Sequence, residues 1–217
     1  MPIHRSIDDV QSRYDQAASR YDKSHGSLRR RRRFQIIDAP QLEAAMGCQR
    51  VLELGCGTGR LLTQVQAAKR VGIDVSFPML QLAKQRHMQV AMGDAHRLPF
   101  PDGVFDAVIA GKGVFRYLDY EKAFAEAARV LVDGGQLGVH QYAARTWAVR
   151  DLLGTPPPEP MHISDLEQLR APARAAGFDN ERCCLWRSVR FPPYALTVPE
   201  WIPGKLWSHC TLVFRKI

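Results

Sequence analysis

Short apolar runs alternate with helix-like segments through the middle of the chain. Continuous apolar runs of this length are typical of strands that are buried on both faces of a sheet. The segments between them place apolar residues at intervals of three and four, which is typical of helices, and helices that connect buried strands predict parallel βαβ units. The predicted strands are 51–54, 71–74, 90–92, 105–109 and 136–142, and the predicted crossover helices are 60–69, 78–87 and 119–132.

Both ends of the chain add elements to this pattern. Helical spacing between Tyr14 and Tyr21, and again over 34–46, predicts two helices before the first strand. The turn at 133–135 should separate the third crossover helix from the fifth strand. A helix that starts after Ser164 and ends at Gly177 should follow, then strands at 181–189 and 209–215, with a proline-broken stretch between them that cannot be a regular strand. The pattern predicts an α/β fold, a doubly wound and mostly parallel sheet of seven strands with N-terminal capping helices.

Composition narrows the class of protein. The 217 residues are 46% hydrophobic and 24% charged, which excludes a chain disordered throughout. No apolar run reaches the roughly 18 residues of a membrane span, so we expect a cytoplasmic protein without stable membrane insertion. Five cysteines in no regular framework predict reduced thiols and no metal site. The net charge of +8 is concentrated in residues 1–33, which hold nine basic and four acidic residues, including the run 29–33 of five arginines.

The segment 51–60, Val-Leu-Glu-Leu-Gly-Cys-Gly-Thr-Gly-Arg, is a predicted strand that leads into a glycine loop at the start of a helix. Gly55 can adopt the strained turn, Gly57 lets backbone approach a ligand, and Gly59 lets the helix pack on the strand. The spacing is one residue shorter than the dinucleotide fingerprint. It therefore weakens NAD and FAD as ligands.

Two carboxylates follow the next two predicted strands. Asp74 lies at the carboxyl end of the second strand, where an acid can accept hydrogen bonds from both hydroxyls of a ribose. Asp94 follows the third strand and could accept a hydrogen bond from the exocyclic amine of adenine. Because strand ends of an open α/β sheet meet at one crevice, the loop and both acids predict a single nucleoside pocket.

Taken together, these segments resemble class I S-adenosylmethionine-dependent methyltransferases, especially the small-molecule branch that includes the quinone-biosynthesis C-methyltransferases. The resemblance covers about residues 12–142 and implies the Rossmann-like methyltransferase fold. The run of five arginines departs from the family. The matching segments are the Tyr14-Asp and Tyr21-Asp helix, 51–60, 72–76, 93–95, 98–108 and 129–135.

The resemblance implies S-adenosyl-L-methionine as cofactor and assigns residues to its parts. Glu53, Gly55 and Gly57 would surround the methionine part, with Gly111 offering backbone to its ammonium group. Asp74 would bind the ribose, and Asp94 with Ala95 the adenine. The full predicted cofactor set is Tyr14, Tyr21, Glu53, Gly55, Cys56, Gly57, Gly59, Asp74, Val75, Asp94, Ala95 and Gly111.

The methyl acceptor is predicted to lie beside this set. Phe115, Arg116 and Tyr117 follow the fourth strand and should face the acceptor cleft, with core packing as the alternative for each. His140, near the end of the fifth strand, is the predicted general base if the acceptor must lose a proton; the alternative is a structural histidine. We expect a helical cap over 1–46 and a methyltransferase core over 47–217, in which 143–207 contributes acceptor-pocket insertions.

Three other functions stay open at this point. The arginine run could neutralise phosphates in an RNA or tRNA methyltransferase, although the fourth strand ends in Ile-Ala-Gly-Lys and lacks the Asn/Asp-Pro-Pro-Tyr signature of enzymes that methylate base amines. The same run could bind an acidic membrane surface. A binding or regulatory module that keeps the pocket without turnover is the third. The sequence identifies neither the acceptor nor the oligomeric state.

Overall fold

The computed structural model describes residues 6–25, 28–142, 166–188, 195–198 and 209–217. Its elements, in chain order, are α1 (Ile7–His25), α2 (Leu28–Ala44), β1 (Arg50–Leu54), the 3-10 turn η1 (Leu62–Gln64), β2 (Lys69–Asp74), α3 (Phe77–Gln85), β3 (Gln89–Met92), β4 (Phe105–Ala110), the 3-10 turn η2 (Phe115–Tyr117), α4 (Tyr120–Val130), β5 (Leu131–Tyr142), α6 (Glu167–Ala175), β6 (Phe178–Ser188), β7 (Ala195–Val198) and β8 (His209–Lys216).

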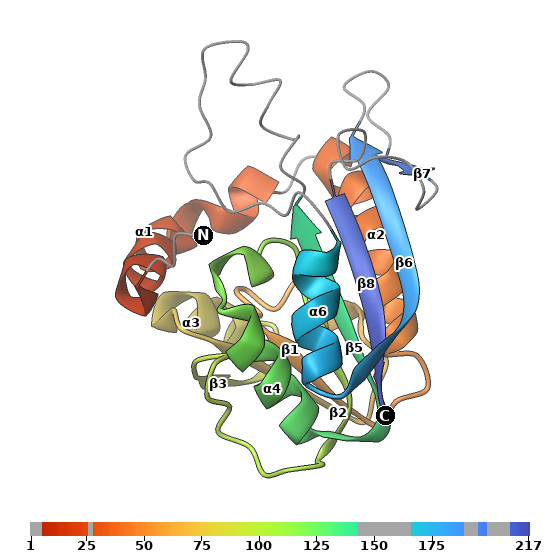
Figure 1. The fold of residues 1–217 in the computed structure, drawn as a ribbon. Helices are drawn as coiled ribbons and strands as arrows, with labels where there is room; N and C mark the ends of the chain where they lie inside the picture. Colours follow the sequence, from red (N-terminus) through yellow and green to blue (C-terminus); the bar gives the residue numbers. More distant parts are fainter. Residues whose placement is uncertain (1–5, 26–27, 143–165, 189–194, 199–208) are drawn as a thin grey trace.

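The described residues form one eight-stranded sheet in the order β3-β2-β1-β4-β5-β8-β6-β7 (Figure 1). The strands β3, β2, β1, β4 and β5 are parallel to one another. The strands β8, β6 and β7 pair in antiparallel fashion at the β5 edge. The predicted α/β class and the doubly wound parallel part are therefore confirmed.

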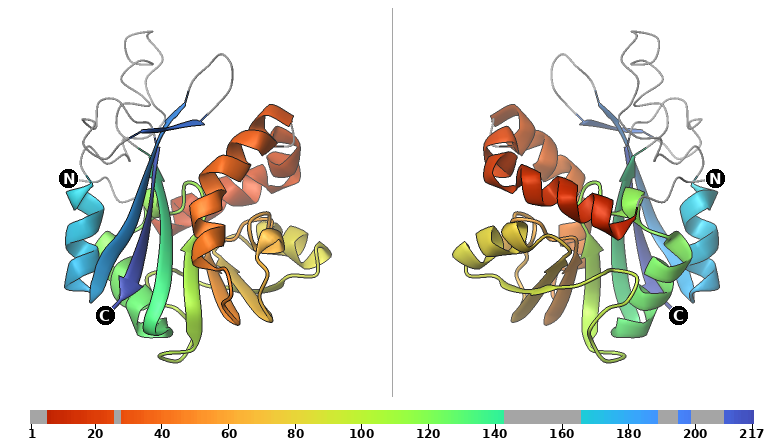
Figure 2. Two further views of the ribbon diagram at one scale, coloured as in Figure 1. Left: turned by 90° about the vertical axis from the view of Figure 1, so that its right-hand side faces the viewer. Right: turned by 90° about the vertical axis from the view of Figure 1, so that its left-hand side faces the viewer.

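Helices cover both faces of the sheet (Figure 2), with α4 and α6 on one face and α2 and α3 on the other. The residues of β4 alternate between the two cores. Val108 packs into the cluster on the α4 side, whereas Ala107 and Ile109 pack with Val51 and Ala45 on the α2 side. This burial on both faces explains the continuous apolar runs in the sequence.

Local signals place the two helices nearest the strand ends. Ser76 caps α3, because its side chain accepts a hydrogen bond from the backbone N–H of Met79, and Asp119 caps α4 in the same way through Lys122. The buried face of α4 carries Phe124, whose ring contacts Phe115 and Phe214. These aromatic contacts join the parallel and the antiparallel parts of the sheet across one core.

The predicted helix over 60–69 is wrong. Only η1 forms there, and Val65 is already extended with φ −72° and ψ 129°. The side chains of Thr63 and Gln64 both donate to the backbone carbonyl of Arg60, at 2.8 and 3.1 Å. They compete for the acceptor that a continuing α-helix would use.

The strand predictions need two corrections. The turn at 133–135 lies inside β5, where the pairing with β4 shifts register between Phe105 and Ala107, so it is an irregularity of one long strand. The proline-broken stretch contains β7, which pairs with β6, and this strand raises the count from the predicted seven to eight. The predicted helix start at Ser164 and most of the predicted insertion 143–207 lie outside the described residues.

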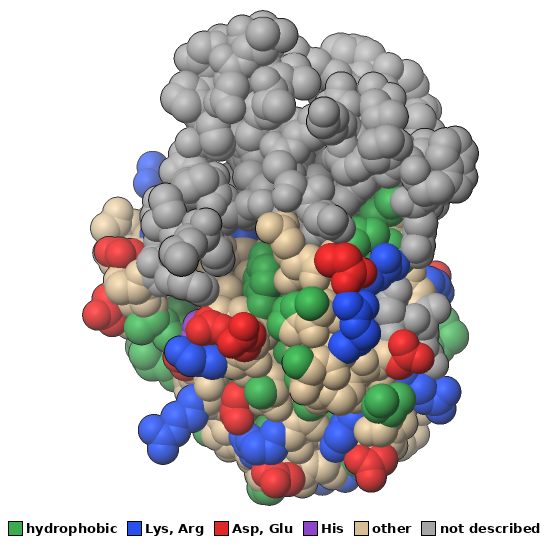
Figure 3. Space-filling view, viewed as in Figure 1, with side chains coloured by type: hydrophobic (Ala, Val, Ile, Leu, Met, Phe, Trp, Pro, Cys, Tyr) green, Lys and Arg blue, Asp and Glu red, His purple; other side chains and the backbone are tan. Residues whose placement is uncertain are grey.

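On one face of the described chain, positive and negative side chains are mixed. Lys and Arg side chains alternate there with Asp and Glu side chains (Figure 3), and the described part of this face carries no broad basic patch. The side chains of the arginine run 29–33 lie outside the described residues, although its backbone belongs to α2. Within the described ranges, no helix has the length and apolar character needed to cross a bilayer.

Candidate functional site

A cavity opens at the carboxyl ends of the parallel strands, where the strand order reverses on either side of β1. We call it the strand-end cavity. Ligands of open α/β sheets bind at this kind of reversal point. Nine of the residues predicted for cofactor or acceptor line it together: Tyr14, Tyr21, Gly55, Gly57, Asp74, Val75, Asp94, Ala95 and Tyr117.

The glycine loop forms the floor of the strand-end cavity. Gly55 and Gly57 have φ of +59° and +52°, a left-handed conformation that residues with a Cβ adopt at a cost. A Cβ on Gly55 would lie 2.7 Å from Cγ2 of Val114, whereas a Cβ on Gly57 would meet no atom within 4 Å. The backbone of Gly57 therefore faces open space on the cavity side.

Asp74 lies at the end of β2 and holds the loop in place. Its carboxylate accepts hydrogen bonds from the N–H of Gly57 at 2.8 Å and from the N–H of Ser76 at 2.9 Å. Burial raises the pKa of Asp74, while these backbone hydrogen bonds lower it. The side chain is thus oriented on two sides and lines the cavity with its remaining surface.

Asp94 and His96 form a bonded pair after β3. One carboxylate oxygen of Asp94 accepts from the backbone N–H of His96 at 2.9 Å and lies 2.8 Å from Nδ1 of the ring. Nε2 of the same ring accepts from the backbone N–H of Asp119 at 2.9 Å. Because Nε2 accepts, Nδ1 carries the proton and donates it to Asp94.

Glu53 and Gly111 lie behind the loop. Glu53 is 3% exposed, and its Oε2 has no hydrogen-bond partner within the described part of the chain. Burial raises the pKa of Glu53 well above its ordinary value. A Cβ on Gly111 would lie 3.4 Å from Oε1 of Glu53, so the backbone after β4 runs close beside the carboxyl group. An unpartnered buried acceptor is unusual and suits a cationic ligand group.

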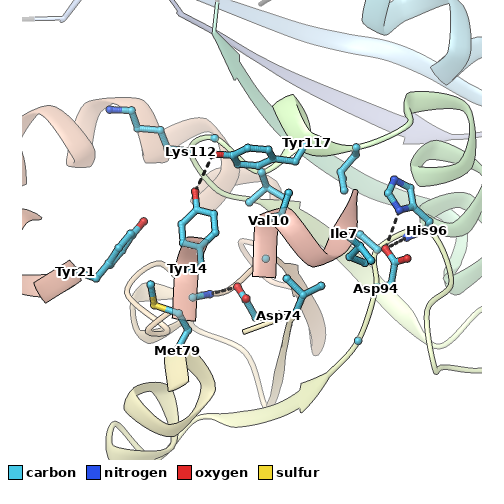
Figure 4. A pocket seen from close by; sticks show the side chains of 18 residues that line it. Ile7, Val10, Tyr14, Tyr21, Asp74, Met79, Asp94, His96, Lys112 and Tyr117 are labelled. Carbon is cyan, nitrogen blue, oxygen red and sulfur yellow. Dashed lines mark hydrogen bonds and ion pairs between the residues drawn. The ribbon is translucent and has the colours of Figure 1, made fainter. Parts of the chain in front are cut away.

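Helix α1 covers the cavity (Figure 4). Ile7, Val10 and Tyr14 of this helix line the cavity, and the Tyr14 side chain points toward Tyr117. Tyr14 donates a hydrogen bond from its hydroxyl to the hydroxyl of Tyr117 at 3.4 Å. The helix supplies an apolar roof opposite a polar floor.

Two acidic residues of α1 fasten the helix to the core. Ser76 donates from its hydroxyl to Asp15 at 2.6 Å, beside the N-terminus of α3. Asp22 accepts from the hydroxyl of Thr58 at 2.9 Å and forms an ion pair with Arg86 at 2.7 Å. Both acids come from the Tyr-Asp dipeptides, which are seven residues apart and so lie on one helix face.

Several predicted residues lie outside the cavity lining. The Sγ of Cys56 packs on Gly72 of β2, and burial raises the pKa of the Cys56 thiol, so it fills space as a protonated group. A Cβ on Gly59 would contact Ala83 of α3, so this glycine permits packing. Phe115 is fully buried in the aromatic core, which matches its alternative of core packing. His140 is fully buried and lines none of the cavities found among the described residues.

The sequence interpretation missed other lining residues. Ile7 and Val10 precede the predicted helix motif and carried no chemical signal. His96 follows the Gly-Asp-Ala segment by one residue, and Lys112 directly follows Gly111. Their positions at two strand ends were the signal that could have identified them.

Comparison with known proteins agrees with this geometry. Residues 52–139 match a family model described as a methyltransferase domain. The chain is 37% identical over 145 residues to the demethylmenaquinone methyltransferase of Thermus thermophilus. The matched region covers 59% of this chain and 64% of that protein. It is 35% identical over 157 residues to the enzyme of that name from Renibacterium salmoninarum, covering 67% of this chain and 63% of that protein. The chain thus spans less than two thirds of the length of these relatives.

Solved structures share the fold. A SAM-dependent methyltransferase of Thermotoga maritima superposes with a TM-score of 0.74 at 20% identity, covering 97% of this chain and 100% of that one. A SAM-dependent methyltransferase of Archaeoglobus fulgidus gives a TM-score of 0.66 at 15% identity, covering 90% and 98%. At these identities the likeness concerns the fold alone.

Proposed function

We propose that the chain transfers a methyl group from S-adenosylmethionine to a small-molecule acceptor. It carries a methyltransferase domain and has the class I methyltransferase fold, so the resemblance predicted from its motifs is confirmed. The observation that supports the proposal most directly is the joining of Asp74 and Gly57 at the floor of the strand-end cavity. A carboxylate fixed beside open loop backbone suits a ribose and its attached chain.

The residues present fit this cofactor at both of its polar ends. Glu53 and Gly111 lie behind the cavity lining, and the buried Oε2 of Glu53, which has no hydrogen-bond partner among the described residues, would suit the ammonium group of the methionine part. Asp74 would accept from the ribose hydroxyls. Asp94 and Ala95 would hold the adenine; both line the cavity, and Asp94 lies at the end opposite Tyr21 and Lys112 (Figure 4).

The sulfonium supplies an already activated methyl group, so the protein's own contribution is positioning. Two oriented reactants held at reaction distance can gain about 7–11 kcal/mol relative to free reactants. The floor of the cavity is fixed by the backbone hydrogen bonds to Asp74, and the roof by the contacts of Asp15 and Asp22 on α1. The side chains of Ile7 and Val10 add apolar surface to this roof.

The general base and the insertion 143–207 stay predictions. His140 is buried under α2 in β5, where Thr211 is its partner in β8, and its side chain lines none of the described cavities. A proposal that needs no base is therefore simpler. The RNA alternative gains no support from the relatives named above, which act on small molecules by name.

Calorimetry with S-adenosylhomocysteine tests the cofactor assignment, and release of S-adenosylhomocysteine during incubation with a panel of small aromatic acceptors tests the transfer. We expect one molecule of S-adenosylhomocysteine bound per chain, and turnover with at least one acceptor. Absence of binding by the folded protein would refute the proposal. Binding without turnover across the panel would favour the non-catalytic module.

A further inference from the structure

We propose that the methyl acceptor is a small aromatic anion, held in a second cavity that adjoins the strand-end cavity. This inference rests on the proposed function and adds the substrate class. The second cavity, which we call the basic cavity, has a volume of about 360 Å³. It is lined by Arg13, Tyr14, Ala17, Arg20, Tyr21, Phe34, Arg60, Lys112, Gly113, Arg116 and Tyr142.

The position of the basic cavity suits an acceptor. It shares four wall residues with the strand-end cavity, namely Tyr14, Tyr21, Lys112 and Gly113. Figure 4 shows Tyr21 and Lys112 at the end of the strand-end cavity that is opposite Asp94 and His96. A molecule in the basic cavity therefore meets a ligand of the strand-end cavity at the end away from the predicted adenine position.

The charge in the basic cavity has one sign. Five of its lining side chains are Arg or Lys, and none of the described residues that line it carries a carboxylate. The buried carboxylate of Asp38 lies next to the cavity and forms an ion pair with Arg60 at 2.6 Å, which offsets one of the five charges. The side chains of Arg13, Arg20, Lys112 and Arg116 line the rest of this cavity, which has the size of a small molecule. An anionic ligand would reduce their mutual repulsion.

Arg116 is the cation best placed to bind the anion. It donates to the hydroxyl of Tyr117, and its guanidinium lies 4.4 Å from the centre of the Tyr117 ring. Its Nε is buried and has no hydrogen-bond partner within the described residues. Burial alone would lower the pKa of Arg116, but the phenol groups of Tyr14 and Tyr117 raise it, so the group stays charged. A planar guanidinium with a free donor suits a carboxylate or phosphate group.

The rings that line the basic cavity explain why the anion should be aromatic. Lys112 Nζ lies 4.9 Å from the centre of the Phe34 ring and 5.5 Å from that of Tyr142. Arg60 lies 4.3 Å from the same Phe34 ring. Flat rings beside flat guanidinium groups form walls that a planar ligand can stack against. A polyanion such as RNA would instead require an open basic surface.

The test uses a matched pair of probes, 2-naphthoate and 2-naphthamide, which have the same ring system but differ in charge. Calorimetry is done on the full chain, first with S-adenosylhomocysteine and then with each probe at saturating S-adenosylhomocysteine. We expect 2-naphthoate to bind at least 10-fold more tightly than 2-naphthamide. Phenyl phosphate in place of 2-naphthoate shows whether a carboxylate or a phosphate is preferred, and cyclohexanecarboxylate shows whether the ring matters.

Variants assign the effect to the cavity. Arg116→Met should raise the Kd of 2-naphthoate about 10-fold and change the Kd of 2-naphthamide by less than 2-fold. Arg116→Lys should recover part of the lost affinity. Arg20→Met removes an exposed cation of the same cavity and should raise the Kd of 2-naphthoate about 3-fold. This variant keeps the test possible if Arg116→Met does not fold. Arg174→Met is the matched control, because this arginine lies on α6 and pairs with Glu167, and it should change neither affinity.

The outcomes separate this inference from the proposed function. Equal affinity for the two probes, with S-adenosylhomocysteine bound normally, would overturn the anionic acceptor and leave the methyltransferase proposal standing. Failure to bind S-adenosylhomocysteine would overturn both. An equal loss of both probes in Arg116→Met would overturn the role of the guanidinium. Displacement of 2-naphthoate by bulk tRNA would overturn the proposal of a small-molecule acceptor in favour of a nucleic acid.

Discussion

The strand-end cavity and the basic cavity adjoin each other but are built from different parts of the chain. The first has a floor of glycine backbone and the short, buried carboxylate of Asp74, fixed by hydrogen bonds such as that from Gly57 to Asp74. The second is lined by long cationic side chains and rings, drawn mainly from α1 and the loop after β4. Backbone geometry is specific and costly to change, whereas long side chains are adjustable. The two cavities therefore differ in how easily a substitution can change them.

The largest expected effect comes from adding one carbon to the floor. Gly55→Ala should destabilise the fold by about 3 kcal/mol, because left-handed backbone costs about 1–2 kcal/mol and the contact with Val114 adds crowding. Gly57→Ala has the same backbone strain but open space around the new carbon, and should cost only about 1 kcal/mol. Urea unfolding of both variants measures the difference. Equal losses would show that the floor is not tightly packed.

The next effect concerns the carboxylate of the floor. Asp74→Asn should raise the Kd for S-adenosylhomocysteine about 30-fold, because charged hydrogen bonds of about 2 kcal/mol to the ribose are weakened. Asp133→Asn removes the same charge from a fully exposed side chain and should leave the Kd unchanged. Calorimetry measures both. An unchanged Kd in a folded Asp74→Asn variant would show that the cavity binds its ligand without this acid.

The same contrast explains what the sequence could predict. The strand-end cavity was predictable because strand, glycine loop and strand-end acids follow one another locally, and Gly55, Asp74 and Asp94 lie where that order puts them. The basic cavity was not, because it joins Arg13 of α1, Phe34 of α2 and Tyr142 of β5, which no local pattern connects. Arg116 was predicted to face the acceptor cleft, but the other cations of the basic cavity are brought next to it by tertiary packing.

Two fold errors have the same origin. The helix predicted over 60–69 has the correct apolar spacing, with Leu61, Leu62 and Val65 all buried, yet Thr63 and Gln64 compete for the backbone acceptor that the helix would use. The strand β7 forms in a proline-rich stretch because β6 offers it an open edge. Periodicity reports which residues are buried; it does not report which hydrogen bonds compete.

A pH experiment tests the buried carboxyl group of Glu53, which lies behind the floor of the strand-end cavity. Burial raises the pKa of Glu53 above its ordinary 4.5, so the folded protein holds a proton there that the unfolded chain releases. Its contribution to the free energy of unfolding therefore falls as pH rises from about 4.5 to the raised pKa, by up to about 1.4 kcal/mol per pH unit. Glu53→Gln should lack this fall. Urea unfolding of both proteins across pH 4 to 8 measures it, and parallel curves would contradict it.

The smallest expected effect concerns an ion pair that holds α1, the helix that lines both cavities, against the core. Asp22 and Arg86 lie 2.7 Å apart with side chains 40% and 35% exposed, so solvent screening limits the pair to about 1 kcal/mol. If α1 must open for the cofactor to leave, Arg86→Met should release S-adenosylhomocysteine about 5-fold faster, measured by stopped-flow displacement. Arg174→Met breaks a similarly exposed pair on α6 and should leave the rate unchanged. Since Arg86 also contacts Thr58, the double variant with Asp22→Asn separates the two contacts. The two losses should not add, because both substitutions break the same pair, and strict additivity would show that the pair does not fasten α1.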